Sequence, residues 1–161
     1  MPQVPNLGVI LLVEDREDDI LLVRRAFKAA FIDNPLHVVR DGEEAIAYLQ
    51  GEGVYSNRAE NPLPSLILLD LKMPKMDGFE VLTYIRQQPG IQRIPVVVLT
   101  SSDDLKDVNR AYSLGANSFL VKPVDFQNYT QLTKLINEYW VNTSKSPEAY
   151  RPPPKPNGSA I

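Results

Sequence analysis

The chain has 161 residues, of which 43% are hydrophobic and 23% charged, with a formal net charge of −3 and no cysteine. This length and composition predict one globular domain with a substantial core. The acidic balance without a basic block argues against direct nucleic-acid binding, and the lack of cysteine excludes disulfides and thiolate metal sites. No apolar run reaches the roughly 20 residues of a membrane helix, and the opening sequence is no signal peptide. We therefore expect a cytoplasmic protein without a membrane span.

Short apolar runs alternate with segments of helical periodicity along the chain. The apolar runs are typical of buried strands and cover residues 9–13, 36–39, 66–69, 96–99 and 118–121. The helical segments repeat apolar residues every three or four positions and cover residues 20–30, 42–50, 78–88, 104–116 and 126–139. Five strand–helix repeats predict an α/β fold, in which a five-stranded parallel sheet carries helices on both faces.

The two ends of the chain differ in composition from this middle part. Residues 1–7 precede the first predicted strand as an N-terminal extension. Residues 144–161 are rich in proline and poor in large apolar side chains, which is typical of a flexible tail. We expect a single domain over residues 8–143, with an unusually long connection at residues 51–64.

Acidic and polar side chains follow four of the predicted strands. Glu14 and Asp15 follow the first strand, Asp70 follows the third, Thr100 closes the fourth and Lys122 closes the fifth. The carboxyl ends of parallel strands meet at one edge of the sheet, where open α/β folds bind ligands. Two carboxylates about 4 Å apart repel by roughly 4 kcal/mol at an effective dielectric constant of about 20, so such a cluster needs protons or a cation. Oxygen ligands alone favour Mg²⁺.

In this setting Asp70 is predicted to be a carboxylate nucleophile that becomes an acyl phosphate. Lys122 and Thr100 would then stabilise the phosphoryl oxygens with a positive charge and a hydrogen-bond donor. Each residue alone also has an ordinary explanation. Asp70 could be a solvated strand end, the pair Glu14 and Asp15 could complement a helix dipole, and Lys122 could face solvent. Their shared position at successive strand ends favours the phosphoryl site.

Four stretches, ILLVED, LILLDLKMPKMDGFEVL, IPVVVLTSS and GANSFLVKPVD, resemble the receiver domain of two-component response regulators, the CheY-like family. The resemblance covers about residues 9–139 and implies the (βα)5 flavodoxin-like receiver fold. It also implies that Asp70 is the phosphoacceptor. By the same resemblance Asp15 ligates Mg²⁺ directly, Glu14 ligates it through water, and Lys72 ligates it through its backbone carbonyl.

The family resemblance implies further roles near the phosphoacceptor. Thr100 and Lys122 would bind the phosphoryl group, Phe119 would be the aromatic residue that moves in the switch, and the bond before Pro123 would be cis. The implied phosphoryl donor is a sensor histidine kinase. The protein would not be an enzyme in the usual sense, because it would only accept and slowly lose its own phosphoryl group.

A narrower resemblance rests on the 51–64 connection, on LHVVRDGEEAIAYL and RAYSLGANSFLVKPVDF, and on the YW pair near the end. These features are similar to the single-domain regulators of bacterial and cyanobacterial phytochromes. They imply a bacteriophytochrome-type kinase as partner and a homodimer formed by the face of the fourth helix, fifth strand and fifth helix. Trp140 is either an outward anchor for that dimer or a cap on the core. His37, the only histidine, is predicted to be a half-buried strand residue.

Two other functions stay open at this point. Metal-dependent phosphatases of the haloacid-dehalogenase type also use an aspartate nucleophile on an α/β sheet, but they need a second aspartate two residues later, where this chain has Lys72. An adaptor that works without phosphorylation could keep the fold for dimerisation alone. Phosphate uptake by the wild type separates the switch from the adaptor, and turnover of a phosphate ester would indicate the phosphatase.

Overall fold

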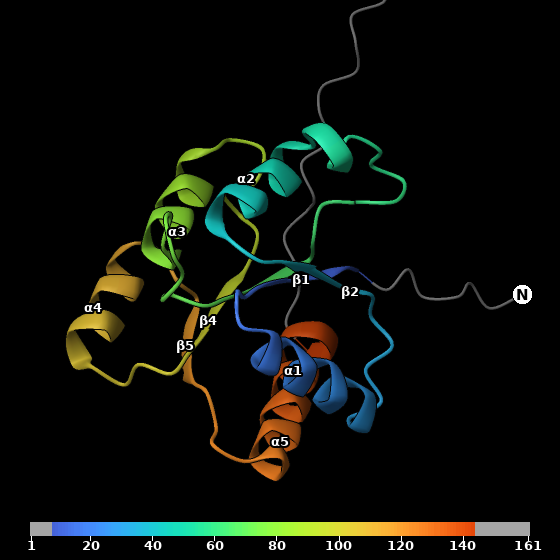
Figure 1. The fold of residues 1–161 in the computed structure, drawn as a ribbon, viewed down its shortest axis with the longest axis vertical. Helices are drawn as coiled ribbons and strands as arrows, with labels where there is room; N and C mark the ends of the chain where they lie inside the picture. The colour runs from blue at the N-terminus through green and yellow to red at the C-terminus, as the bar shows by residue number, and fades with distance from the viewer. Residues whose placement is uncertain (1–7, 144–161) are drawn as a thin grey trace, which may run out of the picture.

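The computed structural model describes residues 8–143, so the predicted N-terminal extension (1–7) and proline-rich tail (144–161) lie outside the described residues. Five parallel strands form one sheet in the order β2-β1-β3-β4-β5 (Figure 1). The strands are β1 (Ile10–Val13), β2 (Leu36–Val39), β3 (Leu66–Leu69), β4 (Val96–Thr100) and β5 (Ser118–Val121). The predicted strand positions are therefore confirmed to within one residue.

Helices cover both faces of this sheet. They are α1 (Glu17–Ala29), α2 (Gly42–Gln50), α3 (Gly78–Gln87), α4 (Leu105–Ser113) and α5 (Phe126–Ile136), with a short 3₁₀ helix η1 (Gly53–Tyr55) and a π-helical segment η2 (Asn137–Thr143). Helices α1 and α5 pack side by side on one face, and α2, α3 and α4 lie on the other (Figure 1). The predicted α/β architecture is confirmed. No helix within residues 8–143 has the length and apolar character that a bilayer crossing requires.

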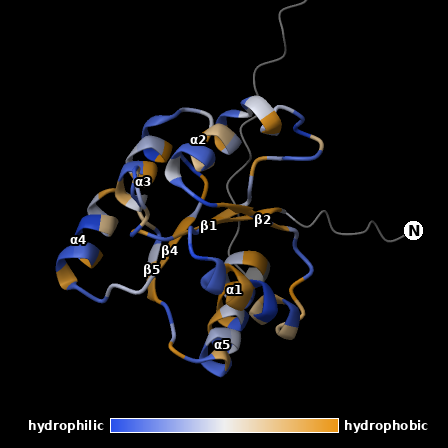
Figure 2. Ribbon diagram, in the orientation of Figure 1, coloured by the Kyte–Doolittle hydropathy of each residue, from blue (hydrophilic) through white to orange (hydrophobic). Residues whose placement is uncertain are grey.

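Alternation along the strands creates two apolar cores, one on each face of the sheet. In β1, Leu11 and Val13 belong to the core under α2 and α3, whereas Ile10 and Leu12 belong to the core under α1 and α5. Figure 2 shows the strands as mainly hydrophobic, whereas the helices combine hydrophilic and hydrophobic stretches. A strand that is covered on both faces has to be apolar at every position, which explains the continuous apolar runs in the sequence.

Strand β5 differs from the prediction of a buried strand. Ser118, Phe119 and Leu120 are half-buried, and Val121 is exposed. The reason is its position at the edge of the sheet, which the apolar pattern alone does not reveal. The N–H of Phe119 donates to the hydroxyl oxygen of Tyr112 on α4 at 3.1 Å, so one amide of this open edge is paired by a side chain.

The starts of the helices fall into two kinds. Four helices begin at an aspartate whose side chain accepts a backbone N–H of the first turn: Asp41, Asp77, Asp104 and Asp125. Helix α1 instead follows Arg16, whose side chain makes no such bond, and its first turn carries Glu17, Asp18 and Asp19. Three acids at a helix N-terminus complement the helix dipole, and they also bring negative charge to the end of β1.

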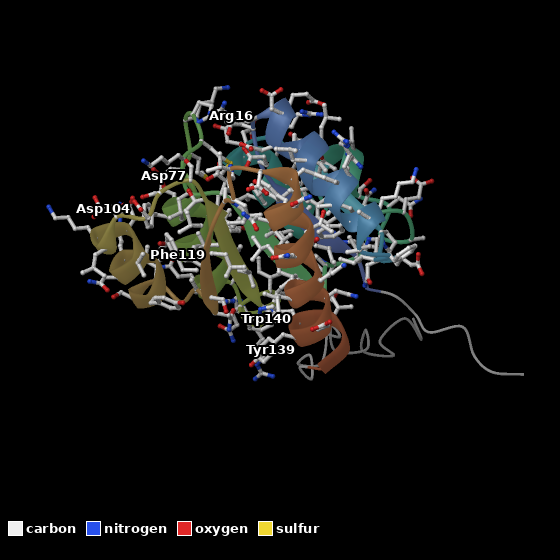
Figure 3. All side chains as sticks on the ribbon, turned by 90° about the horizontal axis from the view of Figure 1, so that it is seen from below. Arg16, Asp77, Asp104, Phe119, Tyr139 and Trp140 are labelled. Carbon is white, nitrogen blue, oxygen red and sulfur yellow. The ribbon has the colours of Figure 1, made fainter. Side chains whose placement is uncertain are left out.

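The C-terminal aromatic pair decides between the two interpretations of Trp140. The Trp140 side chain is partly buried and packs against the core under α1 and α5. Tyr139 beside it is 58% exposed, and the two rings meet edge to face with centroids 5.0 Å apart (Figure 3). The structure therefore supports Trp140 as a cap on the core, and the outward aromatic residue is Tyr139.

His37 connects the sheet to the long 51–64 connection. It is half-buried in β2, as predicted, with Nδ1 2.9 Å from the hydroxyl oxygen of Tyr48. That hydroxyl also lies 2.9 Å from the carbonyl oxygen of Pro62, which can only accept a hydrogen bond. Tyr48 therefore donates to Pro62 and accepts from the Nδ1–H of His37, so the histidine has a structural role.

Candidate functional site

The loops that follow the strands gather at one edge of the sheet. Figure 3 shows Arg16, Asp77 and Asp104, from the loops after β1, β3 and β4, on the side of the molecule opposite Tyr139 and Trp140. This edge is formed by the carboxyl ends of the strands. It is the place where the sequence predicted the acidic cluster.

Three carboxylates converge at this edge. Glu14, Asp15 and Asp70 each offer an oxygen atom, and these atoms all lie within 4.8 Å of one another. Backbone hydrogen bonds fix their positions. The N–H of Glu14 donates to the carbonyl oxygen of Val39 and the N–H of Asp70 donates to that of Val13, and each donor–acceptor distance is 3.0 Å. Glu14 and Asp70 are buried, at 2% and 3% exposure. The predicted convergence of the strand ends is therefore present.

The ammonium group of Lys122 lies among these acids. Its Nζ is 2.6 Å from Glu14, 3.1 Å from Asp70 and 3.0 Å from Asp19. Only 7% of its side chain is exposed. Lys122 therefore reaches the cluster from the end of β5 as predicted. It also binds Asp19 on α1, a carboxylate outside the cluster that was not among the predicted site residues.

The charges in the cluster shift one another's protonation. Burial raises the pKa of Glu14 from 4.5 to about 7, helped by the charge of Asp70 and opposed by the hydrogen bond from Lys122. Burial also works against the charge of Lys122, but its bonds and ion pairs with the acids outweigh burial, and the pKa of Lys122 is raised. The lysine is therefore held as a cation, and the acids need more positive charge than it supplies.

Two buried polar atoms at this edge have no hydrogen-bond partner within the described residues. They are Oδ1 of Asp15 and the hydroxyl oxygen of Thr100. A buried polar group without a partner is costly, so both atoms are suited to an oxygen-binding cation or an anionic ligand. The N–H of Lys122 donates to the carbonyl oxygen of Thr100 at a distance of 2.7 Å, and this hydrogen bond joins the ends of β4 and β5. Phe119 is half-buried in β5 and pairs with Val98, which lies two residues before Thr100 in β4.

Two further predictions concern the backbone near the cluster. The N–H of Lys72 lies 3.3 Å from Oδ1 of Asp70, so the backbone of Lys72 adjoins the cluster while its side chain is exposed. The predicted cis bond between Lys122 and Pro123 is wrong, because the described part of the chain contains no cis peptide bond. The trans form is ordinarily favoured by about 0.5–1 kcal/mol, and Lys122 reaches the acids with it.

Gly78 begins α3 directly behind Asp70. A Cβ atom at this position would lie 2.2 Å from the carbonyl oxygen of Asp70 and 2.7 Å from Cα of Leu71. Backbone atoms cannot move aside as a flexible side chain can. Gly78→Ala is therefore expected to lower the free energy of unfolding by about 2 kcal/mol in chemical denaturation. Glu80→Ala, an exposed position on the same helix, is the control, and equal stability of both variants would contradict this close packing.

The sequence did contain a signal for Asp19. It lies four residues before Val23, which is 2% exposed, so both residues share one face of α1. An acid on the inward face of a helix, one turn after the acidic pair of β1, is more informative than an acid on the outward face. The predicted helical segment begins at residue 20, so it does not include Asp19 and does not place it on the face of Val23.

Most of the chain matches a known protein family. Residues 10–134 match the family model described as the response regulator receiver domain. The chain belongs to the response regulator receiver family. It is 45% identical to the response regulator Rcp1 of Synechocystis sp. over 141 residues, which is 88% of this chain and 94% of Rcp1. It is also 40% identical to a probable methanogenesis regulatory protein, FilR2 of Methanothrix harundinacea, over 86% of this chain and 87% of that protein.

Solved structures of receiver proteins agree with the fold. The Mn²⁺-bound form of Rcp1 matches with a TM-score of 0.79 and 44% identity, covering 88% of this chain and 99% of that chain. The phosphorylated cyanobacterial phytochrome response regulator RcpA matches with a TM-score of 0.81 and 41% identity over the same shares. The chain is therefore a receiver-domain response regulator that is homologous to phytochrome response regulators.

Proposed function

We propose that this receiver domain, taken as residues 8–143, is a phosphorylation switch in which Asp70 accepts the phosphoryl group. The observation that carries the proposal is the convergence of Glu14, Asp15 and Asp70 within 4.8 Å, with the ammonium of Lys122 3.1 Å from Asp70. A carboxylate oxygen of Asp70 would attack the phosphorus atom of a phosphohistidine, and the bond from phosphorus to the histidine nitrogen would break.

The residues at this site fit a divalent cation, for which we propose Mg²⁺. All side-chain donors are carboxylate oxygens, and the buried Oδ1 of Asp15 has no other partner among the residues described. Asp15 and Asp70 would bind the ion directly, Glu14 through water, and Lys72 through its backbone carbonyl. When bound, the ion supplies positive charge that offsets the negative charge of the phosphoryl oxygens.

The chain's own residues would complete the reaction and the switch. Lys122 would donate to one phosphoryl oxygen, and the buried hydroxyl of Thr100, which has no hydrogen-bond partner within residues 8–143, would donate to another. Movement of Thr100 toward the phosphoryl group would leave room for Phe119 to turn inward from the edge strand. No substrate is turned over, so the protein would act as a switch and not as an enzyme.

The proposed phosphoryl donor is a sensor histidine kinase of the bacteriophytochrome type in the cytoplasm. The likeness to regulators named for phytochromes, RcpA among them, supports this choice. The likeness to FilR2 shows that relatives at similar identity include a protein named for methanogenesis, so a panel of kinases has to be tested. Phosphotransfer to this chain from a phytochrome kinase, faster than from other kinases, is the expected result.

We further propose that a homodimer forms through the face of α4, β5 and α5, without direct binding of nucleic acid. Large apolar side chains are exposed on and beside these elements: Leu105, Tyr112, Val121, Val124, Leu135 and Tyr139. Large exposed apolar side chains at these elements favour a protein–protein contact. Tyr139 replaces Trp140 as the aromatic residue available to a partner.

Acetyl phosphate with Mg²⁺ tests the proposed phosphoacceptor. The wild type is expected to take up one phosphoryl group, and Asp70→Asn to take up none, because the amide is a poor nucleophile. Mass spectrometry measures the added group. No uptake by the wild type, together with unchanged dimerisation in Asp70→Asn, would indicate the adaptor instead, and turnover of a generic phosphate ester would indicate the phosphatase.

A further inference from the structure

The hydrogen-bonding capacity of Lys122 is fully used in the structure. An ammonium group has three N–H donors. Three carboxylates lie within bonding distance of Nζ: Glu14 at 2.6 Å, Asp19 at 3.0 Å and Asp70 at 3.1 Å. Lys122 therefore sits in a position that these three acids determine, although its long side chain has several rotatable bonds.

Asp19 differs from the other two acids in one respect. Glu14 and Asp70 form the carboxylate cluster together with Asp15. One oxygen atom from each of the three lies within 4.8 Å of the others. Asp19 is not a member of that cluster, and it comes from helix α1 and not from a strand end. Two acceptors of Lys122 are thus shared with the proposed cation site, whereas Asp19 lies outside that site.

The helix dipole does not by itself explain the orientation of Asp19. Glu17, Asp18 and Asp19 all lie in the first turn of α1 and all complement its dipole. Glu17 and Asp18 are exposed, but the side chain of Asp19 is only 19% exposed and faces Lys122. Arg16 Nε lies 3.7 Å from the same carboxylate, so its charge is balanced from two sides.

We infer that Asp19 is a positioning residue, which holds the ammonium of Lys122 beside Asp70 through a contact that the cation site does not share. This inference rests on the proposed phosphoryl transfer. During the transfer, Lys122 exchanges its bond to the Asp70 carboxylate for a bond to a phosphoryl oxygen. Asp19 keeps the lysine at the site during this exchange, so that little reorganisation precedes the reaction.

The test uses Asp19→Asn, which keeps the shape of the side chain and removes its charge. At saturating Mg²⁺, the rate constant of phosphoryl uptake from acetyl phosphate is expected to fall about tenfold, because a small displacement of a catalytic group is costly. Asp18→Asn is the matched control in the same turn of α1 and is expected to stay within about twofold of the wild type. Asp19→Glu restores the charge and is expected to recover part of the rate.

Two further measurements show whether Asp19 acts through Lys122. In a Lys122→Ala background, Asp19→Asn is expected to change the rate no further, as a double-mutant cycle would show for residues that act as a pair. In the unphosphorylated protein, the NMR signal of the Lys122 ammonium is expected to shift and broaden in Asp19→Asn but not in Asp18→Asn. This second measurement needs no phosphoryl transfer.

The outcomes separate the inference from the proposed function. If Asp19→Asn matches Asp18→Asn in rate and in the Lys122 signal, the positioning role is wrong. The role is also wrong if Asp19→Asn slows uptake equally with and without Lys122. If the wild type takes up no phosphoryl group, the proposed function fails, while the NMR signal still decides whether Asp19 holds the lysine.

Discussion

Replacing Lys122 by alanine is expected to lower the free energy of unfolding by about 3 kcal/mol in metal-free buffer, because it leaves buried acids without a counter-charge. Glu14 and Asp70 are almost inaccessible to solvent and both bind this ammonium group. The loss should be measured by urea denaturation in EDTA. Lys134→Ala, at an exposed position on α5, is the control and should change stability little.

The loss caused by Lys122→Ala should depend on pH in a defined direction. The pKa of Glu14 is about 7 in the folded protein against 4.5 ordinarily, so the folded state holds this proton more tightly than the unfolded state does. Protonated Glu14 therefore contributes fully to the unfolding free energy below pH 4.5, and this contribution is lost as pH rises through 7. Without Lys122 the pKa of Glu14 rises further. The variant should therefore lose more unfolding free energy, relative to the wild type, at pH 8 than at pH 6.

Added Mg²⁺ provides the decisive control for the Lys122 variant. If the acids form a cation site, millimolar Mg²⁺ should recover much of the lost stability, since a ligand that binds only the folded state stabilises it. The variant should also take up a phosphoryl group without reaching the switched conformation. A phosphorylated Lys122→Ala protein that switches normally, or a loss of stability that Mg²⁺ does not touch, would contradict the role given to this lysine.

Arg86→Ala is expected to cost about 3 kcal/mol of unfolding free energy, because one half-buried guanidinium group donates to several acceptors. Arg86 on α3 donates to the carbonyl oxygens of Gln92, Ile94 and Gly115 and to Oδ1 of Asn117, at 2.8–2.9 Å. Burial lowers its pKa, as expected for a charge withdrawn from water. Without it, backbone carbonyls from two separate loops lose their partner.

The control for Arg86 is Arg93→Ala, an exposed arginine in the loop before β4. It should change the midpoint of urea denaturation little. Arg86→Lys keeps the charge but cannot reach four acceptors from one planar group, so it should recover only part of the loss. Since this network lies away from the acidic cluster, phosphoryl uptake per folded molecule should stay unchanged. Equal stability of Arg86→Ala and Arg93→Ala would show that the network contributes nothing.

The positions of the strands could be predicted because each strand is a short and mainly apolar run. How deeply each strand is buried could be predicted less well. Strand β5 has an apolar pattern like that of the central strands, yet Val121 is exposed because β5 lies at the edge of the sheet. The order of the strands cannot be predicted from the pattern of one segment. The same limit applies to Trp140, whose direction depends on how the end of α5 packs against α1.

The convergence of Asp15, Asp70 and Lys122 could be predicted because residues after parallel strands meet at one edge whatever the strand order. Asp19 could not be placed in this way. Its approach to Lys122 depends on the rotation of α1 about its axis, which is set by side chains such as Val23 packing into the core. The trans bond before Pro123 was missed for another reason, since the cis form was expected from family resemblance and not from the residues.

The hydrogen bond from Phe119 to Tyr112 bears on how two copies of this protein could associate. An open edge can extend a sheet across a dimer only when its amides are available to a strand of the neighbouring copy. One such amide is already occupied by the tyrosine of the same chain. Contact at this face should accordingly rely on side chains, with each copy retaining a separate sheet, and a Tyr112→Phe substitution would release that amide and make continuous intermolecular pairing easier.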